Sequence, residues 1–486
     1  MERHHAEDAH RQPRDVFMSD LLLRCYHRLP GPFRSVAATA RGEYLRRWRY
    51  GPETGRLIEQ AHEREYWDGA RWERWRAERL AHVLHRAATK VPYYREQWAA
   101  RRAAGDRSSP ERLEHWPILE KDAVRRHARS LVADGCDIKR MFHEHTSGTT
   151  GKPLDLWWPR AAVREWYALF EARCRLWYGV SRHDRWAMLA GQLVTPVEQL
   201  KPPFWVWNSA LHQLYMSSYH LSPAFLPSYL DALSRYRITH LSGYASALYS
   251  LAQEALRQGR RDIQMRVAIT NAEPVFDHQR RAITEAFGCP VCETYGMAEI
   301  VTCGSQCAAG RLHSWPEIGV TEVDAAGGLD ETGAGALLGT SLLNADMPLV
   351  RYRTGDRGAM APEDAPCACG RSLPVIASID GRADDMLYTS DGRSVGRLDP
   401  VFKAQVPVRE AQIIQETLTR VRVRFVPGLG FTATTERSIA SRLRARLGDI
   451  DVVFEAVTDI PRTSRGKFRA VVCELPESER QRLSIH

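Results

Sequence analysis

The sequence contains no apolar run that approaches the ~18 residues of a membrane-spanning helix. Residues 1–15 are rich in charge and lack the apolar segment of a secretory signal. We therefore expect a cytoplasmic protein with no membrane-inserted segment. The 486-residue chain is 44% hydrophobic and 26% charged, which is typical of globular proteins and excludes a disordered tail, a coiled coil or a collagen-like repeat.

Lysine is also scarce. Seven lysines stand beside 61 arginines and 59 acidic residues, for a formal charge of +9. The arginines are spread along the chain among Asp and Glu, which is typical of a mixed, solvated surface. No basic stretch is interleaved with aromatic residues, so we expect no nucleic-acid partner. Because an ammonium group and a guanidinium group do different chemistry, each of the few lysines is a candidate for a specific role.

We expect no disulfides, because a chain without an export signal keeps its thiols reduced. Four of the ten cysteines are scattered, and packing as small apolar side chains explains them: Cys25, Cys136, Cys174 and Cys473. Two close pairs differ from these, Cys303 with Cys307 and Cys367 with Cys369. The two pairs are candidates for metal binding.

The pattern of apolar residues predicts an α/β protein with two domains. Residues 14–105 have helical spacing and indicate an N-terminal helical extension. The middle of the chain alternates short strand-like runs with helical stretches. Beyond residue 381 the pattern is that of a small α+β unit. We therefore expect a large N-terminal domain over residues 1–381 and a small C-terminal domain over residues 382–486.

The segment Thr146-Ser-Gly-Thr-Thr-Gly-Lys-Pro153 combines hydroxyl side chains, two glycines and a lysine. Backbone amides in such a loop can approach and cradle phosphate oxygens. It is not a Walker loop, because only two residues separate Gly148 from Gly151 and Pro153 follows Lys152. Taken alone, a polar turn between strands explains the segment equally well.

Five further motifs follow this loop in order, and together they carry a resemblance. They are Asn271-Ala-Glu-Pro274, Thr294-Tyr-Gly-Met-Ala-Glu299, Arg353-Thr-Gly-Asp356, Gly381-Arg-Ala-Asp-Asp385 and Pro461-Arg-Thr-Ser-Arg-Gly-Lys467. The set resembles the adenylate-forming enzymes, the superfamily of acyl-CoA synthetases and peptide-synthetase adenylation domains. Within it, segments such as HRAATKVPYYRE and DGRSVGRLDPVFK resemble the phenylacetate–CoA ligase branch and, more narrowly, the CapK-type proteins of capsular polysaccharide biosynthesis.

The resemblance implies a large multi-sheet domain, a small mobile C-terminal domain, and ATP and Mg²⁺ as ligands. It implies that phosphates are bound by a loop of seven residues: Thr146, Ser147, Gly148, Thr149, Thr150, Gly151 and Lys152. The adenine and ribose would be held by Ala272, Glu273, Pro274, Tyr295, Gly296 and Asp356, with Arg382 nearby. Glu299 would bind Mg²⁺, a hard cation that prefers carboxylate oxygen. Lys467 would contact the α-phosphate and the substrate carboxylate, and Asp384 would be the hinge between the half-reactions.

Two positions depart from the family's usual pattern. Asn271 stands where the adenine-side motif usually has glycine, and Ala298 stands where the next motif usually has threonine. Each of the charged residues also has a plain structural alternative. Glu299 can be a surface carboxylate, Asp356 a turn residue after Gly355, and Lys467 a solvated charge.

Three thiolates and one imidazole match a closed tetrahedral zinc site: Cys307, His313, Cys367 and Cys369. The spacings are not those of a standard zinc finger, but some members of the resembled branch carry a structural zinc in this place. Cys303 is an alternative ligand, and the alternative interpretation is that the four residues hold no metal. A site with four protein ligands has no open position for water, so we expect a structural role.

These observations lead to a ligase hypothesis with alternatives. ATP and a small-molecule carboxylic acid would form acyl-AMP with release of pyrophosphate, and the acyl group would pass to coenzyme A, an amine or a carrier thiol. The first alternative is a nucleotide-binding protein of a surface-polysaccharide or natural-product pathway that activates no acid. The second is a zinc-dependent nucleic-acid module, which the scattered arginines disfavour. Aromatic residues between 191 and 244, including Tyr215, Tyr219 and Tyr244, would line the acid pocket, although core packing explains them equally.

Overall fold

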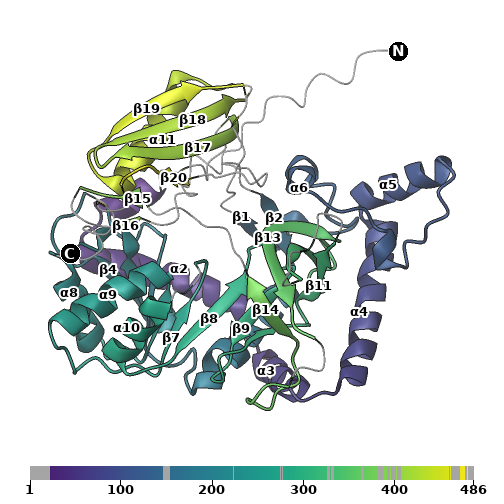
Figure 1. Cartoon of the computed structure of the whole chain (residues 1–486), viewed down its shortest axis with the longest axis horizontal. Helices are drawn as coiled ribbons and strands as arrows, with labels where there is room; N and C mark the ends of the chain where they lie inside the picture. The colour runs from purple at the N-terminus through teal and green to yellow at the C-terminus, as the bar shows by residue number, and fades with distance from the viewer. Residues whose placement is uncertain are drawn as a thin grey trace.

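A computed structural model gives the architecture of the chain (Figure 1). It describes residues 22–145, 154–379, 387–476 and 479, with gaps at 197, 223, 274, 276, 326–328, 330–332, 363–365, 391–393, 396–400, 402–406, 429, 459 and 461–470. No helix within these ranges is both long and apolar enough to cross a membrane.

Helices dominate the first part of the chain. They are α2 (Gly31–Arg49), α3 (Thr54–Arg64), α4 (Gly69–Lys90), α5 (Pro92–Ala103) and α6 (Lys121–His127). The short turn η1 (Leu113–His115) precedes α6, and η2 (Ile138–Arg140) follows it. The side chain of Asp68 caps α4 by accepting a hydrogen bond from the Arg71 amide. The helix ends at Val91 because the following proline disfavours helical backbone, and Pro92 then opens α5.

One twelve-stranded sheet runs through the large domain. Its strands are β3 (Trp186–Ala190), β4 (Trp205–Asn208), β5 (Gln213–Ser217), β6 (His240–Gly243), β7 (Val267–Thr270), β8 (Val291–Gly296), β9 (Cys303–Gln306), β10 (Leu312–Ser314), β11 (Gly319–Asp324), β12 (Gly335–Ser341), β13 (Tyr352–Met360) and β14 (Val375–Ile379). Their order is β11-β12-β13-β14-β10-β9-β8-β7-β6-β3-β5-β4. A separate hairpin, β1 (Phe142–His145) and β2 (Asp155–Trp158), flanks residues 146–153.

Strand pairing in the sheet changes from parallel to antiparallel at β8. Strands β5, β3, β6, β7 and β8 run parallel, whereas β9 pairs antiparallel with β8 and the pairings from β9 to β11 are antiparallel. Strands β6 and β7 are buried along their whole length, as parallel strands covered by helices require. The helices of this part are α7 (Arg160–Phe170), the π-helical turn η3 (Glu171–Arg175), α8 (Leu226–Arg235), α9 (Ala245–Arg257) and α10 (Asp277–Phe287).

A smaller unit follows residue 387. Strands β17 (Val408–Thr417), β18 (Arg420–Pro427), β19 (Asp451–Ala456) and β20 (Val471–Cys473) form a sheet in the order β19-β18-β17-β20, with α11 (Ala433–Leu447) and the short pair β15 (Leu387–Tyr388) and β16 (Ser394–Val395). It has its own apolar core, which includes Ile413, Val423 and Leu443. The predicted fold class, an α/β protein with a large sheet domain and a small C-terminal domain, is confirmed.

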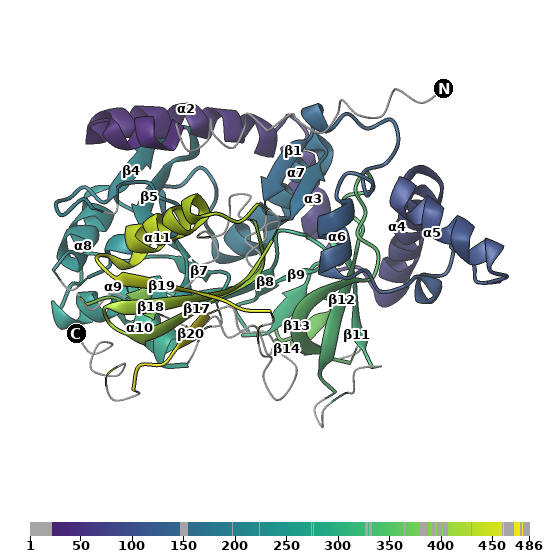
Figure 2. The same cartoon turned by 90° about the horizontal axis from the view of Figure 1, so that it is seen from above.

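The small unit lies beside the half of the large sheet that carries α8–α10, away from α4 and α5 (Figure 1; Figure 2). One contact between the two is cationic: the Arg446 guanidinium of α11 lies over the ring of Tyr219, 5.5 Å from its centre. The predicted boundary at residues 381 and 382 lies outside the described residues.

Candidate active site

Several predicted site residues lie outside the described residues. These are the phosphate loop, the last residue of the adenine-side motif, the hinge segment and the C-terminal lysine: Thr146, Ser147, Gly148, Thr149, Thr150, Gly151, Lys152, Pro274, Arg382, Asp384 and Lys467. Their roles stay predictions. The geometry below concerns the remaining residues.

The structure brings two of the predicted motifs together. Tyr295 lies near the end of β8, and its hydroxyl donates a 3.0 Å hydrogen bond to the Asp356 carboxylate on β13. Three strands, β14, β10 and β9, separate the two in the sheet order, so the contact joins segments that are not neighbours in the sheet. Two of the residues predicted to hold the nucleoside, Tyr295 and Asp356, are therefore in contact.

Glu299 follows β8 and is 5% exposed. Its Oε1 atom lies 3.2 Å from the Lys121 ammonium and accepts a 2.7 Å hydrogen bond from the Tyr352 hydroxyl. We call Glu299, Lys121, Tyr352, Tyr295 and Asp356 the Glu299 group. Burial of a carboxylate is costly unless charge and hydrogen bonds compensate it, and here a cation and a hydroxyl do so.

Lys121 and Tyr352 were not predicted from the sequence. Lys121 opens α6, far from every motif in the sequence, and Leu119 just before it forms a β-bridge with Tyr352. The scarcity of lysine was a usable signal, because Lys121 is one of only seven. Tyr352 directly precedes the Arg353-Thr-Gly-Asp356 motif, so extending that motif by one residue would have included it.

The turn after β7 has an unusual backbone. The Asn271 amide bonds to the Gly243 carbonyl, and Ala272 then takes a left-handed conformation with φ of 62°. Ile300, beside Glu299, and Arg351, beside Tyr352, are also left-handed, with φ of 46° and 48°. Such non-glycine residues cost about 1–3 kcal/mol each and cluster at functional sites. Glu273 is half-buried in the same turn, and Gly296 ends β8.

A second group of side chains, Cys307, His313, Cys367 and Cys369, has the geometry of a metal site. Their ligand atoms all lie within 4.8 Å of one another. The Cys307 and Cys367 sulfurs are 3.6 Å apart, and the Cys369 sulfur is 3.3 Å from His313 Nε2. Zinc–sulfur bonds of ~2.3 Å in a tetrahedron place sulfurs about 3.8 Å apart. The residues therefore fit a four-coordinate zinc, and we call them the Cys₃His cluster.

The cluster is built by two similar turns. Cys307 and Cys367 each begin a Cys-x-x-Gly turn whose glycine, Gly310 or Gly370, has a φ of 80° or 78° and bonds back to the cysteine carbonyl. Only glycine adopts this backbone without strain. The first turn joins β9 to β10, and the second precedes β14, so the cluster links strands that are distant in sequence but paired in the sheet.

His313 is oriented as a metal ligand. Its Nδ1 atom lies 3.0 Å from the Leu373 carbonyl, which fixes the proton there and turns Nε2 toward the sulfurs. Burial lowers the pKa of the imidazole, so the ring stays neutral and keeps a lone pair. Cys303, the alternative ligand, lies on β9 outside the cluster, and burial raises the pKa of its thiol to about 12.

A buried ionic network borders the Cys₃His cluster. Arg173 is fully buried and makes two hydrogen bonds of 2.8 and 2.7 Å to the Glu317 carboxylate. Glu65, also buried, accepts hydrogen bonds from Arg371 and from the Trp177 indole, both at 2.8 Å. Arg371 is two residues from Cys369, so the network connects helix α3 to the second cysteine turn.

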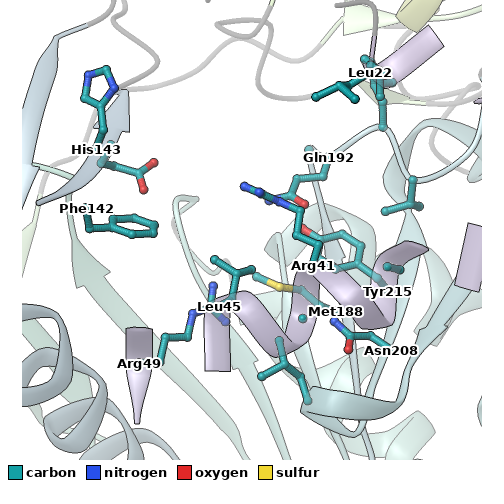
Figure 3. Close-up of a pocket in the computed structure, with 18 of the residues that line it drawn as sticks. Leu22, Arg41, Leu45, Arg49, Phe142, His143, Met188, Gln192, Asn208 and Tyr215 are labelled. Atoms are coloured by element: carbon teal, nitrogen blue, oxygen red, sulfur yellow. The ribbon is translucent and has the colours of Figure 1, made fainter. Parts of the chain in front are cut away.

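A large cavity opens over the carboxyl ends of the parallel strands (Figure 3). Met188 on β3, Ser242 on β6 and Asn271 after β7 line it. In open α/β sheets ligands bind at this edge. Tyr215 lines the cavity as the sequence suggested, whereas Tyr219 and Tyr244 lie beside it and hold Gly191 through its carbonyl and amide.

Comparisons with known proteins identify relatives of this chain. Residues 387–474 match the family model described as the CapK C-terminal domain. Protein CapK of Staphylococcus aureus is 24% identical over 387 residues, which are 78% of this chain and 84% of CapK. The phenylacetate-coenzyme A ligase of Pseudomonas putida is 27% identical over 331 residues, 64% of this chain and 70% of the ligase. This chain is a homologue of CapK and of the phenylacetate-coenzyme A ligases.

The structure of this CapK homologue is also similar to a solved one. The 2-hydroxyisobutyryl-CoA ligase in complex with 2-HIB-AMP and CoA, in its thioesterification state, matches with a TM-score of 0.53. The match covers 87% of this chain and 94% of the ligase at 20% identity, and it concerns the fold. The predicted resemblance to adenylate-forming enzymes, including its CapK-type branch, is confirmed.

Proposed function

We propose that this protein is an ATP-dependent ligase that activates a carboxylic acid as acyl-AMP and transfers the acyl group to coenzyme A. The observation that carries the proposal is the Glu299 group, which joins residues of α6, β13 and the end of β8. The homologues of this chain include phenylacetate-coenzyme A ligases. Coenzyme A is favoured over an amine, because the matched ligases are coenzyme A ligases.

Acyl-AMP formation joins two anions, so positioning and charge neutralisation are the main requirements. Tyr295 and Asp356 would hold the nucleoside, the tyrosine by its ring and the aspartate by the ribose hydroxyls. Lys121 and Tyr352 position the Glu299 carboxylate, which fits the oxygen ligand of a magnesium ion. Glu299 would hold this ion, which would supply positive charge against the phosphates. The phosphate loop from Thr146 to Lys152 would bind the leaving pyrophosphate.

Lys467 would neutralise charge where the carboxylate meets the α-phosphate. Its ammonium is compact enough to contact both anions. The Cys₃His cluster would hold a structural zinc away from the reaction, and Asp384 would allow the small domain to turn between the half-reactions. The relatives include CapK as well as coenzyme A ligases, so the acceptor needs a direct test.

The test is pyrophosphate exchange dependent on an added acid, followed by transfer to coenzyme A. Lys467→Ala should lower the exchange rate at least ~100-fold, the scale of one electrostatic group in a transition state. Lys90→Ala, at an exposed lysine of α4, is the matched control and should exchange normally. Unchanged exchange in folded Lys467→Ala would remove this lysine from the mechanism. Nucleotide binding without exchange for any acid in a broad library would favour the non-acylating alternative.

A further inference from the structure

One face of helix α2 forms a wall of the cavity. Arg41, Gly42, Leu45 and Arg49 all line it, and their spacing of three and four residues places them on a single helical face (Figure 3). The helix packs against β4, at the edge of the sheet. Figure 3 shows Arg41 and Leu45 extending from α2 into the open space.

The four arginines in the C-terminal half of α2 divide into two sets. Arg46 and Arg47 pair with Glu43 at 2.7 and 2.9 Å, which neutralises them on the helix itself. Arg49 lies over the ring of Tyr167, 4.5 Å from its centre. Among the residues that the structure describes, neither Arg41 nor Arg49 has an acidic partner. The cavity face of α2 therefore presents two cations whose charge the described protein does not neutralise.

Asn208 adds a buried polar atom to the same wall. It ends β4, is 7% exposed and lines the cavity, and its Oδ1 atom has no hydrogen-bond partner in the described structure. It lies directly against α2, where a Cβ atom on Gly42 would be 2.1 Å from this oxygen. This oxygen is closed off against the helix, so Asn208 packs β4 against α2 and the cavity-facing polar groups of this wall are those of Arg41 and Arg49.

The part of the cavity between α2 and the ends of β6 and β7 is more apolar than the α2 wall. Met188 and Tyr215 line the middle, and Ser242 and Asn271 line the end where the strands β6 and β7 finish. A ligand whose carboxylate reacts near Asn271 would pass Met188 and Tyr215 before reaching α2. Its far end would meet Arg41 and Arg49.

We propose that the acid substrate is elongated and carries a second anionic group at its far end, bound by Arg41 and Arg49. This inference rests on the proposed function and adds a substrate class to it. Charge-assisted hydrogen bonds from two guanidinium groups favour a carboxylate or a phosphate over a neutral end.

The probes are two stable acyl-adenylate mimics that differ only at the far end. One is octanoyl-sulfamoyl-adenosine, and the other is its counterpart made from suberic acid, which ends in a second carboxylate. Titration calorimetry should give about tenfold tighter binding for the dicarboxylate mimic, the scale of one charge-assisted hydrogen bond. Arg41→Leu should abolish this preference. Arg47→Leu, on the outer face of α2, is the matched control and should preserve it.

The outcomes separate the two proposals. If neither mimic binds to folded protein, the proposed function fails and the substrate class with it. If both bind equally, the nucleotide site stands and the second anionic subsite is wrong. If Arg41→Leu leaves the preference intact but weakens coenzyme A binding, the wall binds a phosphate of the acceptor and the inference is overturned. Melting curves of both variants establish that each is folded.

Discussion

The Cys₃His cluster and the Glu299 group lie on the same sheet but are built in different ways. The cluster is formed by four side chains on two short turns, and its internal distances already match a tetrahedral metal site. The Glu299 group gathers residues from α6, β8 and β13, and its described partners are other protein groups. In a site closed by four protein ligands, the side chains alone define the geometry of the metal. In a site open to substrate, the side chains define only the protein's part of the geometry.

The largest expected effect is on the closed site. Cys369→Ser should reduce the zinc content from about one per chain to near zero, because one of four ligands is lost. It should lower the free energy of unfolding by about 4 kcal/mol or more, as losses of structural metals do. Elemental analysis and urea denaturation measure both.

Cys25→Ser is the control, because Cys25 is exposed and outside the cluster. It should change neither the zinc content nor the stability. Metal-free protein of full stability would contradict the zinc assignment. The Cys₃His cluster would then not be a closed metal site.

The next effect concerns the ionic network beside the cluster. Glu317→Gln would leave the fully buried Arg173 without its bidentate partner. Breaking a buried pair in this way costs about 3–5 kcal/mol. The exposed pair of Glu43 with Arg46 offers the matched control, and Glu43→Gln should leave the free energy of unfolding nearly unchanged. Equal losses in the two variants, measured by denaturation, would mean that burial does not set the cost.

At the open site we expect an effect on rate rather than on stability. Glu299→Gln removes the charge proposed to bind magnesium and should lower acid-dependent pyrophosphate exchange about 100-fold. Zinc content should stay at the wild-type value. Glu120→Gln, at an exposed carboxylate beside α6 that pairs with Arg353, should exchange normally. Loss of zinc in Glu299→Gln would show that the two sites are not independent.

The smallest effect should follow Tyr295→Phe. The variant keeps the ring but removes the 3.0 Å hydrogen bond to Asp356. The KM for ATP should rise about 3–10-fold, the scale of one hydrogen bond, with little change in kcat. Steady-state kinetics at varied ATP separate the two. A fall in kcat as large as that of Glu299→Gln would assign the hydroxyl a part in the chemistry.

The sequence predicted well wherever local pattern carries the information. The order of the motifs anticipated that Tyr295 and Asp356 belong to one site, and the thiols anticipated the Cys₃His cluster. Zinc occupancy and the roles of the site residues stay predictions. The clear helical end at Val91, fixed by the following proline, needed no tertiary information.

What sequence could not supply depends on packing between distant segments. Lys121 reaches Glu299 only because the chain before α6 pairs with β13 through Leu119 and Tyr352. The composition of α2 predicts a helix, but not that Arg41 faces a cavity while Arg47 faces outward. The spacing of apolar residues in the sequence shows which face of a helix is polar. It does not show whether that polar face contacts a ligand or water.

The pairing of β10 with β14 has a consequence for synthesis. Strand β10 already has β9 as a neighbour when it leaves the ribosome, but its other neighbour begins at residue 375. At ~5–20 residues per second, the open edge waits on the order of several seconds for its partner. The exposed edge is only three residues long, from Leu312 to Ser314. Short edges are poor templates for pairing with other chains, so the nascent protein passes through this interval with little surface on which to aggregate.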